Sequence, residues 1–132
     1  MSFCLDTSFI VNYLRQKSGW AEKVAVLRKK GAFKISIITY AELYFGMLMA
    51  NQQNKEQSKI RKFLADFQVE IVPATIAEAE TYAQGRYFLE NKGTRIDNFD
   101  LLIAATAKAN KATLVTDNPK HFRGFPGLKI SN

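Results

Sequence analysis

Four of the twelve acidic residues stand apart from the others by their surroundings. Asp6 and Asp117 each follow a short apolar run. Glu42 is the single charged residue of a strongly apolar stretch, and Asp100 begins another such stretch. Five other acids fall among lysines and arginines on expected helix surfaces, and we assign them no function: Glu22, Glu56, Asp66, Glu80 and Glu90.

If the four carboxylates converge, they repel one another, and their pKa values rise unless a cation neutralises them. Their oxygens are the hard ligands that Mg²⁺ or Mn²⁺ prefers. The one histidine, His121, is expected in a loop and the one cysteine, Cys4, in the core, so neither suggests a softer metal site. The chain has a net charge of +7. An acidic metal site in a basic protein is typical of a nuclease, whose lysines and arginines hold the phosphate backbone.

Three of these acids also have an ordinary structural interpretation. Asp6 fits an N-cap, and Asp117 fits the start of a turn that Pro119 continues. Asp100 fits the third position of a helix capped by Asp97, where the helix dipole favours a carboxylate. Each explanation is sound for one residue, but so many such positions in one small chain favour a common site.

Glu42 has the strongest structural alternative. Thr39-Tyr40-Ala41-Glu42 matches the capping box, in which the glutamate accepts the N-cap amide. The same signature recurs from Thr75 to Glu78, to which we assign no function. Spacing alone therefore favours a capping role for Glu42, whereas its apolar surroundings predict a buried carboxylate that needs a partner.

Short apolar strands alternate with helices along the chain. We expect strands at Phe3–Leu5, Lys34–Ile38, Val69–Val72, Thr113–Val115 and Leu128–Ile130. Thr7 is the expected cap of the first helix, and we expect helices to about Leu14, then at Gly19–Lys30, Thr39–Ala50, Lys55–Phe67, Thr75–Glu90 and Asp97–Asn110. This order predicts an α/β fold with a mainly parallel sheet between helices. Because ligands bind at the carboxyl ends of such strands, the fold brings Asp6 and Asp117 to the binding edge.

The length of 132 residues suits one domain over residues 1–132, and the chain shows no linker or domain-sized repeat. No basic stretch precedes the first apolar run, so we expect no signal peptide. No apolar run reaches membrane-spanning length. We therefore expect a cytoplasmic protein with no membrane partner.

The stretch expected to form a helix from Thr39 to Ala50 carries more apolar side chains than one core-facing side needs. They are Tyr40, Tyr44, Phe45, Met47, Leu48 and Met49. Exposed apolar patches of that size usually contact a partner, so this helix predicts a homodimer.

Four motifs together resemble those of a PIN domain, and the resemblance is greatest to the VapC-like toxins of bacterial toxin–antitoxin pairs. The motifs are Leu5-Asp6-Thr7-Ser8, Glu42 after Thr39-Tyr40-Ala41, Asp100-Leu101-Leu102-Ile103-Ala104-Ala105-Thr106-Ala107, and Val115-Thr116-Asp117-Asn118 followed by Phe122. Their order and spacing agree over nearly the whole chain. The first motif has Ser8 where the family usually has asparagine.

The resemblance implies a PIN-like α/β/α sandwich and a metal-dependent endoribonuclease that uses Mg²⁺ or Mn²⁺. It implies that Asp6, Glu42 and Asp100 are metal-site carboxylates and that Asp117 is a further acid at the rim. The supporting residues implied are Thr7, Ser8 and Thr116. The resemblance also implies an RNA substrate, a homodimer and a cognate VapB-like antitoxin, bound in a groove with a basic side chain near the acids.

Other functions are compatible with parts of this pattern. A PIN nuclease of RNA maturation would carry the same acids, and only a neighbouring antitoxin gene would separate it from a toxin. A non-catalytic RNA-binding module of the same fold would have lost some of the acids, and none is missing. A haloacid-dehalogenase-type phosphatase needs Asp-x-Asp-x-Thr, whereas Asp6 precedes Thr7 and Ser8. A receiver domain needs a late lysine where Thr116 stands.

Overall fold

The computed structural model describes residues 1–131 and contains a five-stranded sheet in the order β3-β2-β1-β4-β5. The strands are β1 (Ser2–Leu5), β2 (Ala32–Ser36), β3 (Glu70–Val72), β4 (Thr113–Val115) and β5 (Ile130–Ser131). All pairings are parallel, so every strand ends at the same edge of the sheet. The expected domain, residues 1–132, includes Asn132, which lies outside the described residues.

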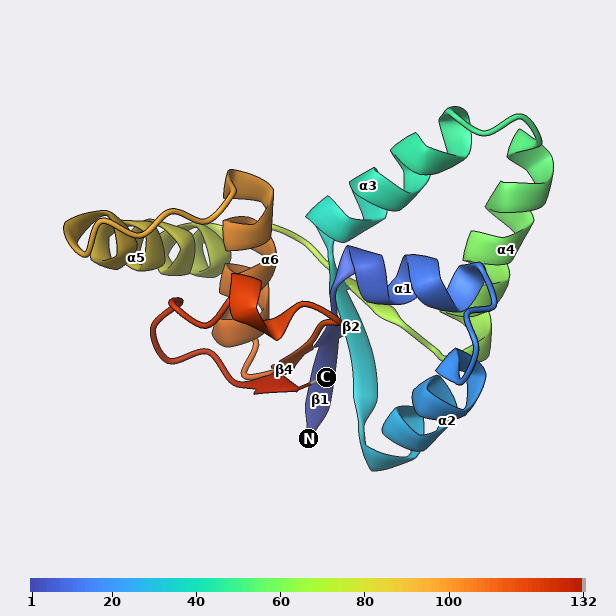
Figure 1. Cartoon of the computed structure of the whole chain (residues 1–132), viewed down its shortest axis with the longest axis horizontal. Helices are drawn as coiled ribbons and strands as arrows, with labels where there is room; N and C mark the ends of the chain where they lie inside the picture. Colours follow the sequence, from blue (N-terminus) through green and yellow to red (C-terminus); the bar gives the residue numbers. More distant parts are fainter. Residues whose placement is uncertain (132) are drawn as a thin grey trace.

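Six α-helices and one 3₁₀ helix cover the described part of the sheet. They are α1 (Thr7–Leu14), α2 (Trp20–Lys30), α3 (Ile37–Leu48), α4 (Gln53–Asp66), α5 (Ile76–Asn91), α6 (Asn98–Ala109) and the 3₁₀ helix η1 (Pro119–His121). Figure 1 shows α1, α2 and α4 on one side of the sheet, α5 and α6 on the other, and α3 extending from the carboxyl edge. The predicted α/β/α sandwich is confirmed. In residues 1–131 no helix is both long and apolar enough to span a membrane.

Two buried clusters hold the layers together, one on each face of the sheet. Side chains of a strand alternate between faces. Phe3 and Leu5 of β1 accordingly pack with α1 to α4, whereas Cys4 between them packs with α6. Burial raises the pKa of the Cys4 thiol to about 12, so the thiol is neutral. Its predicted place in the core is confirmed.

The predicted boundary between β2 and α3 is wrong. The strand ends at Ser36 and the helix begins at Ile37, two residues before the expected start at Thr39. Ser36 is still paired with Val72 of β3 and also caps α3, because its hydroxyl accepts the Thr39 amide at 3.0 Å. Other details differ as well: β2 begins at Ala32 rather than Lys34, and α4 begins at Gln53 rather than Lys55. The last strand lies at Ile130–Ser131 rather than 128–130, and Asp6 rather than Thr7 caps α1.

The helix α3 is buried on one side only. Leu43 and Met47 are buried, but Phe45 is 64% exposed, Leu48 48% and Met49 71%. Only one side of α3 packs on the core, because the helix projects beyond the sheet (Figure 1). The opposite side is an uncovered apolar face in the single chain.

Two helical glycines provide a matched test of packing. A Cβ added to Gly85 of α5 would lie 2.5 Å from the buried Phe125 ring, whereas one added to Gly46 of α3 would contact nothing within 4 Å. We expect Gly85→Ala to lower the free energy of unfolding by about 1–3 kcal/mol through overpacking. Gly46→Ala should raise it by about 0.5–1 kcal/mol, because alanine loses less backbone entropy in a helix. Urea unfolding of both variants measures the difference, and equal effects would contradict the described α5 packing.

Candidate active site

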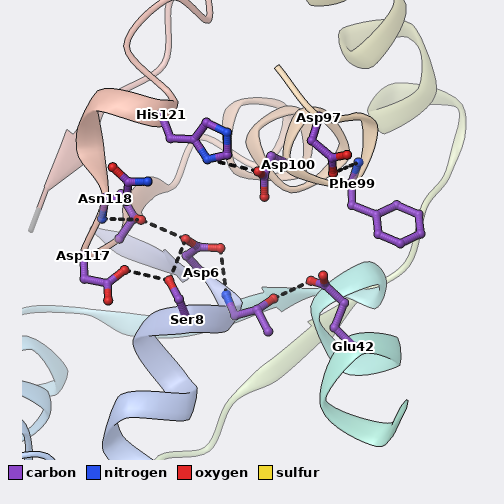
Figure 2. Close-up of polar contacts among 11 residues, drawn as sticks. Asp6, Ser8, Glu42, Asp97, Phe99, Asp100, Asp117, Asn118 and His121 are labelled. Atoms are coloured by element: carbon purple, nitrogen blue, oxygen red, sulfur yellow. Dashed lines mark hydrogen bonds and ion pairs between the residues drawn. The ribbon is translucent and has the colours of Figure 1, made fainter. Parts of the chain in front are cut away.

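Three of the four predicted acids line one cleft at the carboxyl edge of the sheet. Asp6 follows β1, Glu42 comes from α3, and Asp100 comes from the first turn of α6 (Figure 2). The cleft has a volume of about 490 Å³, and its lining residues are Asp6, Thr7, Ser8, Val11, Asn12, Arg15, Glu42, Asp100, Asn118 and His121. Asp117 is not part of this lining; it lies at the edge of the cleft, where it contacts Ser8.

Asp6 is the most enclosed of the four predicted site acids, with 6% of its surface exposed. It caps α1 by accepting the Thr7 amide at 2.8 Å, so its predicted N-cap role is confirmed alongside its place in the cleft. The buried Thr116 hydroxyl donates to its Oδ2 at 2.8 Å, and that hydroxyl in turn accepts the Asn118 amide at 3.0 Å. Burial raises the pKa of Asp6, and the bond from Thr116 opposes that rise.

Asp117 is exposed and is held by two side chains of α1. Asn12 donates to its Oδ2 at 2.6 Å, and the Ser8 hydroxyl donates to its Oδ1 at 2.7 Å. The Ser8 oxygen also lies 3.2 Å from Oδ2 of Asp6 (Figure 2). Ser8 therefore connects the acid that follows β1 with the acid that follows β4.

Glu42 does not cap its helix. The cap is Ser36, so the capping-box interpretation of Glu42 is wrong. Its carboxylate instead accepts a 2.6 Å hydrogen bond from the Thr7 hydroxyl of α1, which also lines the cleft. The buried carboxylate predicted from the apolar surroundings is half-buried, and it has the partner that burial requires.

Glu78 shows what a true capping box looks like in the same chain. Its carboxylate accepts hydrogen bonds from the Thr75 amide, at 2.8 Å, and from the Thr75 hydroxyl. Asn110, at the C-terminal end of α6, donates a third hydrogen bond to it at 3.0 Å. The hydrogen bond from the Thr75 hydroxyl is the main reason that the pKa of Glu78 is lowered. The two Thr-x-x-Glu signatures thus have different structures.

Asp100 is half-buried and pairs with the histidine of η1. Oδ2 of Asp100 lies 3.1 Å from Nδ1 of His121 (Figure 2). Burial is the largest cause of the raised pKa of Asp100; His121 lowers this pKa, whereas Asp6 and Glu42 raise it. Asp97 caps α6 as predicted, by accepting the Phe99 amide at 3.1 Å.

The chemistry of these groups fits a hard divalent cation. The side chains surround the cleft, and within residues 1–131 no three His, Cys, Asp or Glu groups are already gathered as a coordination shell. The available donors are carboxylate oxygens, which Mg²⁺ and Mn²⁺ prefer. Burial and neighbouring charges raise the pKa values of Asp6 and Asp100, and a cation in the cleft would stabilise their charged forms.

The sequence model of the PIN domain matches residues 3–127. The chain belongs to the PIN-domain family. It is 35% identical to the ribonuclease VapC2 of Rickettsia felis, over 100% of this chain and 98% of that protein.

Solved structures of VapBC complexes contain chains similar to this PIN domain. A chain in the crystal structure of VapBC2 from Rickettsia felis, bound to a DNA fragment from their promoter, has a TM-score of 0.92 at 34% identity. That match covers 100% of this chain and 98% of the other. A chain of DNA-bound VapBC from Salmonella typhimurium has a TM-score of 0.89 at 25% identity, covering 99% and 97%.

Three residues that line or edge the site of this PIN domain were not predicted. His121 was expected in a loop, but it pairs with Asp100. Asn12 and Arg15 line the cleft from α1 and were not considered. The sequence did carry a signal for Asn12 and Arg15. They follow Ser8 at intervals of four and then three residues, which places Ser8, Asn12 and Arg15 along one side of a helix.

The two Thr-x-x-Glu glutamates provide a matched test of ligand against cap. Glu78→Gln should lower the free energy of unfolding by about 1 kcal/mol at pH 7, because a neutral amide replaces the capping carboxylate and a helix cap contributes about that much. The loss should shrink as the pH falls through the lowered pKa of Glu78, since protonation then removes the same charge from the parent protein. Glu42→Gln should leave the metal-free protein as stable as the parent or more so, because one repelling charge is removed.

Thermal unfolding of both variants across a Mg²⁺ titration completes this test. Glu42→Gln should weaken the Mg²⁺-dependent rise in melting temperature, and Glu78→Gln should leave the rise unchanged, because a ligand stabilises only through its affinity for the folded state. The same metal response in the two variants would remove Glu42 from the site.

Proposed function

We propose that the chain is a metal-dependent endoribonuclease and the toxin of a VapBC-like pair, acting as a single PIN domain in the cytoplasm. The observation that carries the proposal is the cleft lined by Asp6, Glu42 and Asp100, at the carboxyl edge of the sheet in a PIN-domain chain. The net charge of +7 suits a polyanionic substrate. The similarity to a ribonuclease VapC over the full chain supports RNA as that substrate.

Asp6, Glu42 and Asp100 would hold a Mg²⁺ or Mn²⁺ ion, with Asp117 as a further acid at the rim. When bound, the ion supplies Lewis-acid chemistry: it lowers the pKa of a water and stabilises charge on the phosphate. The chain supplies the orientation. Thr116 and the Thr7 amide fix Asp6, and the Thr7 hydroxyl fixes Glu42.

The remaining polar groups of the site complete this orientation. His121 fixes Asp100 from η1, and Ser8 and Asn12 fix Asp117 from α1. Each carboxylate is therefore contacted by a polar side chain from a different element. No side chain of this set needs to act as a nucleophile, because hydrolysis uses water.

The partner of the toxin is a cognate VapB-like antitoxin, as the solved VapBC complexes of similar chains support. Next to the cleft lies a groove of about 410 Å³ between α1, α3 and α4. Its apolar lining residues are Val11, Leu14, Leu43, Met47, Ala50 and Ile60. We place an antitoxin segment in this groove, with its basic side chain beside Glu42, which borders both groove and cleft.

Asp100→Asn should abolish RNA cleavage while leaving the fold intact. The change removes a negative charge from the group expected to bind the ion, and it relieves repulsion from Asp6 and Glu42 in the metal-free protein. The measurement is cleavage of total RNA with and without Mg²⁺ or Mn²⁺, followed by sequencing of the new ends, beside a thermal unfolding curve. Undiminished cleavage by the parent protein in excess EDTA would falsify the metal-dependent reaction.

The exposed side of α3 supports a homodimer. Phe45, Leu48 and Met49 are exposed there, and Phe45 shares a pocket with Ile38, Ala41 and the 54%-exposed Phe99 of α6. Tyr40 and Met47, which the sequence added to this face, instead pack inward. Covering these aromatic rings with a second copy would remove apolar surface from water, which stabilises association.

Phe45→Glu should convert the dimer to a monomer at micromolar concentration. A carboxylate at the centre of an apolar interface loses hydration without gaining a partner. Val26→Glu is the matched control, since Val26 is 52% exposed on α2, away from the α3 face. Light scattering coupled to size exclusion separates the outcomes: a parent protein that is monomeric would overturn the homodimer.

A further inference from the structure

Arg15 is a residue of the cleft for which no function has been given above. It ends α1, with its amide donating to the Val11 carbonyl at 2.9 Å. Ser8, Asn12 and Arg15 line the cleft from the same side of α1. Ser8 and Asn12 each donate a hydrogen bond to Asp117, whereas the Arg15 side chain is exposed at the C-terminal end of α1.

Arg15 contributes to the cleft a positive charge that no acid of the described residues pairs with. Two basic side chains belong to the lining, Arg15 and His121. His121 contacts Asp100, but the Arg15 guanidinium forms no ion pair with any acid within residues 1–131. An arginine stays charged at any pH that a folded protein experiences. Its charge is therefore available to an anion that enters the cleft.

The position of Arg15 suits a polyanion longer than one phosphate. Arg15 borders the acidic cleft and also the groove between α1, α3 and α4, so it lies where one opens into the other. An RNA strand with one linkage beside Asp6 and Asp100 carries further phosphates out of the cleft. Those phosphates need cations, because the carboxylates that bind the ion repel them.

We propose that Arg15 binds a phosphate of the RNA strand adjacent to the cleaved linkage; this role rests on the ribonuclease function proposed above. The guanidinium presents a planar fork of N–H donors that matches two phosphate oxygens. Such a contact positions the backbone and carries no information about the bases. Arg15 is thus a substrate-positioning residue, separate from the acids that hold the ion.

The salt dependence of RNA binding tests this assignment. The Asp100→Asn protein, which is expected not to cleave RNA, is titrated with a fluorescent single-stranded RNA in Mg²⁺ at several salt concentrations, and the affinity is followed by anisotropy. Adding Arg15→Ala should reduce the slope of log Kd against log salt by about 0.7, the value for one phosphate contact on a single strand. Adding Arg15→Lys should preserve the slope, because the charge remains.

Arg61→Ala is the matched control. Arg61 is an exposed arginine of α4 that lines neither the cleft nor the groove, so its loss should leave the slope unchanged. In the active protein, Arg15→Ala should lower kcat/KM about tenfold, mainly through KM, because a charge-assisted hydrogen bond of about 1.5 kcal/mol is lost.

Several results would overturn the assignment. One is an unchanged slope in Arg15→Ala, and another is an equal reduction in Arg61→Ala, which would indicate a general charge effect. A third is an unchanged slope together with lost binding of the co-expressed antitoxin, which would indicate that Arg15 binds the antitoxin rather than RNA. If the parent protein neither binds nor cleaves RNA, the ribonuclease function itself fails, and that result differs from a failure confined to Arg15.

Discussion

Repulsion between carboxylates is the constraint around which this molecule is organised. Asp6, Glu42 and Asp100 come to one cleft from three different elements, and burial, together with the charges of Asp6 and Glu42, raises the pKa of Asp100. Left to themselves, such groups would move apart or take up protons. The structure opposes both responses by giving each acid its own polar partner: Thr116 for Asp6, Thr7 for Glu42 and His121 for Asp100.

The parallel sheet makes this arrangement possible. Because all five strands run in one direction, the segments that leave β1, β2 and β4 emerge side by side at one edge. The segment after β1 begins α1 with Asp6, the segment after β2 begins α3, and the segment after β4 leads through Thr116 to η1. Clusters of apolar side chains pack against both faces and hold these strands in place. The strand ends therefore do not move apart when like charges are brought together at this edge.

Much of this arrangement could be predicted from the sequence. Strand ends identified Asp6 and Asp117, because a parallel sheet gathers the residues that follow its strands. The start of α3 could not be predicted, because Ser36 and Thr39 are both good caps by local chemistry. The pairing of Ser36 with Val72, far along the chain, decides between them.

Contacts between distant segments explain the other errors. His121 and Asp100 are joined only by the fold, so local spacing gave no sign of their pair. The hydrophobic pattern of α3 likewise did not distinguish a helix buried on all sides from one that projects past the sheet. The position of the helix relative to the sheet decides that Phe45 is exposed and Leu43 buried.

The serine in the first motif has a consequence for the charge of the site. A hydroxyl carries one proton, whereas the asparagine usual at this position in the family carries two amide protons on one nitrogen. The Ser8 oxygen lies within reach of both Asp117 and Asp6, yet at any moment its proton serves only one of them. When that proton points to Asp117, Asp6 is left with Thr116 and the Thr7 amide as its donors, so less of its negative charge is compensated within the cleft.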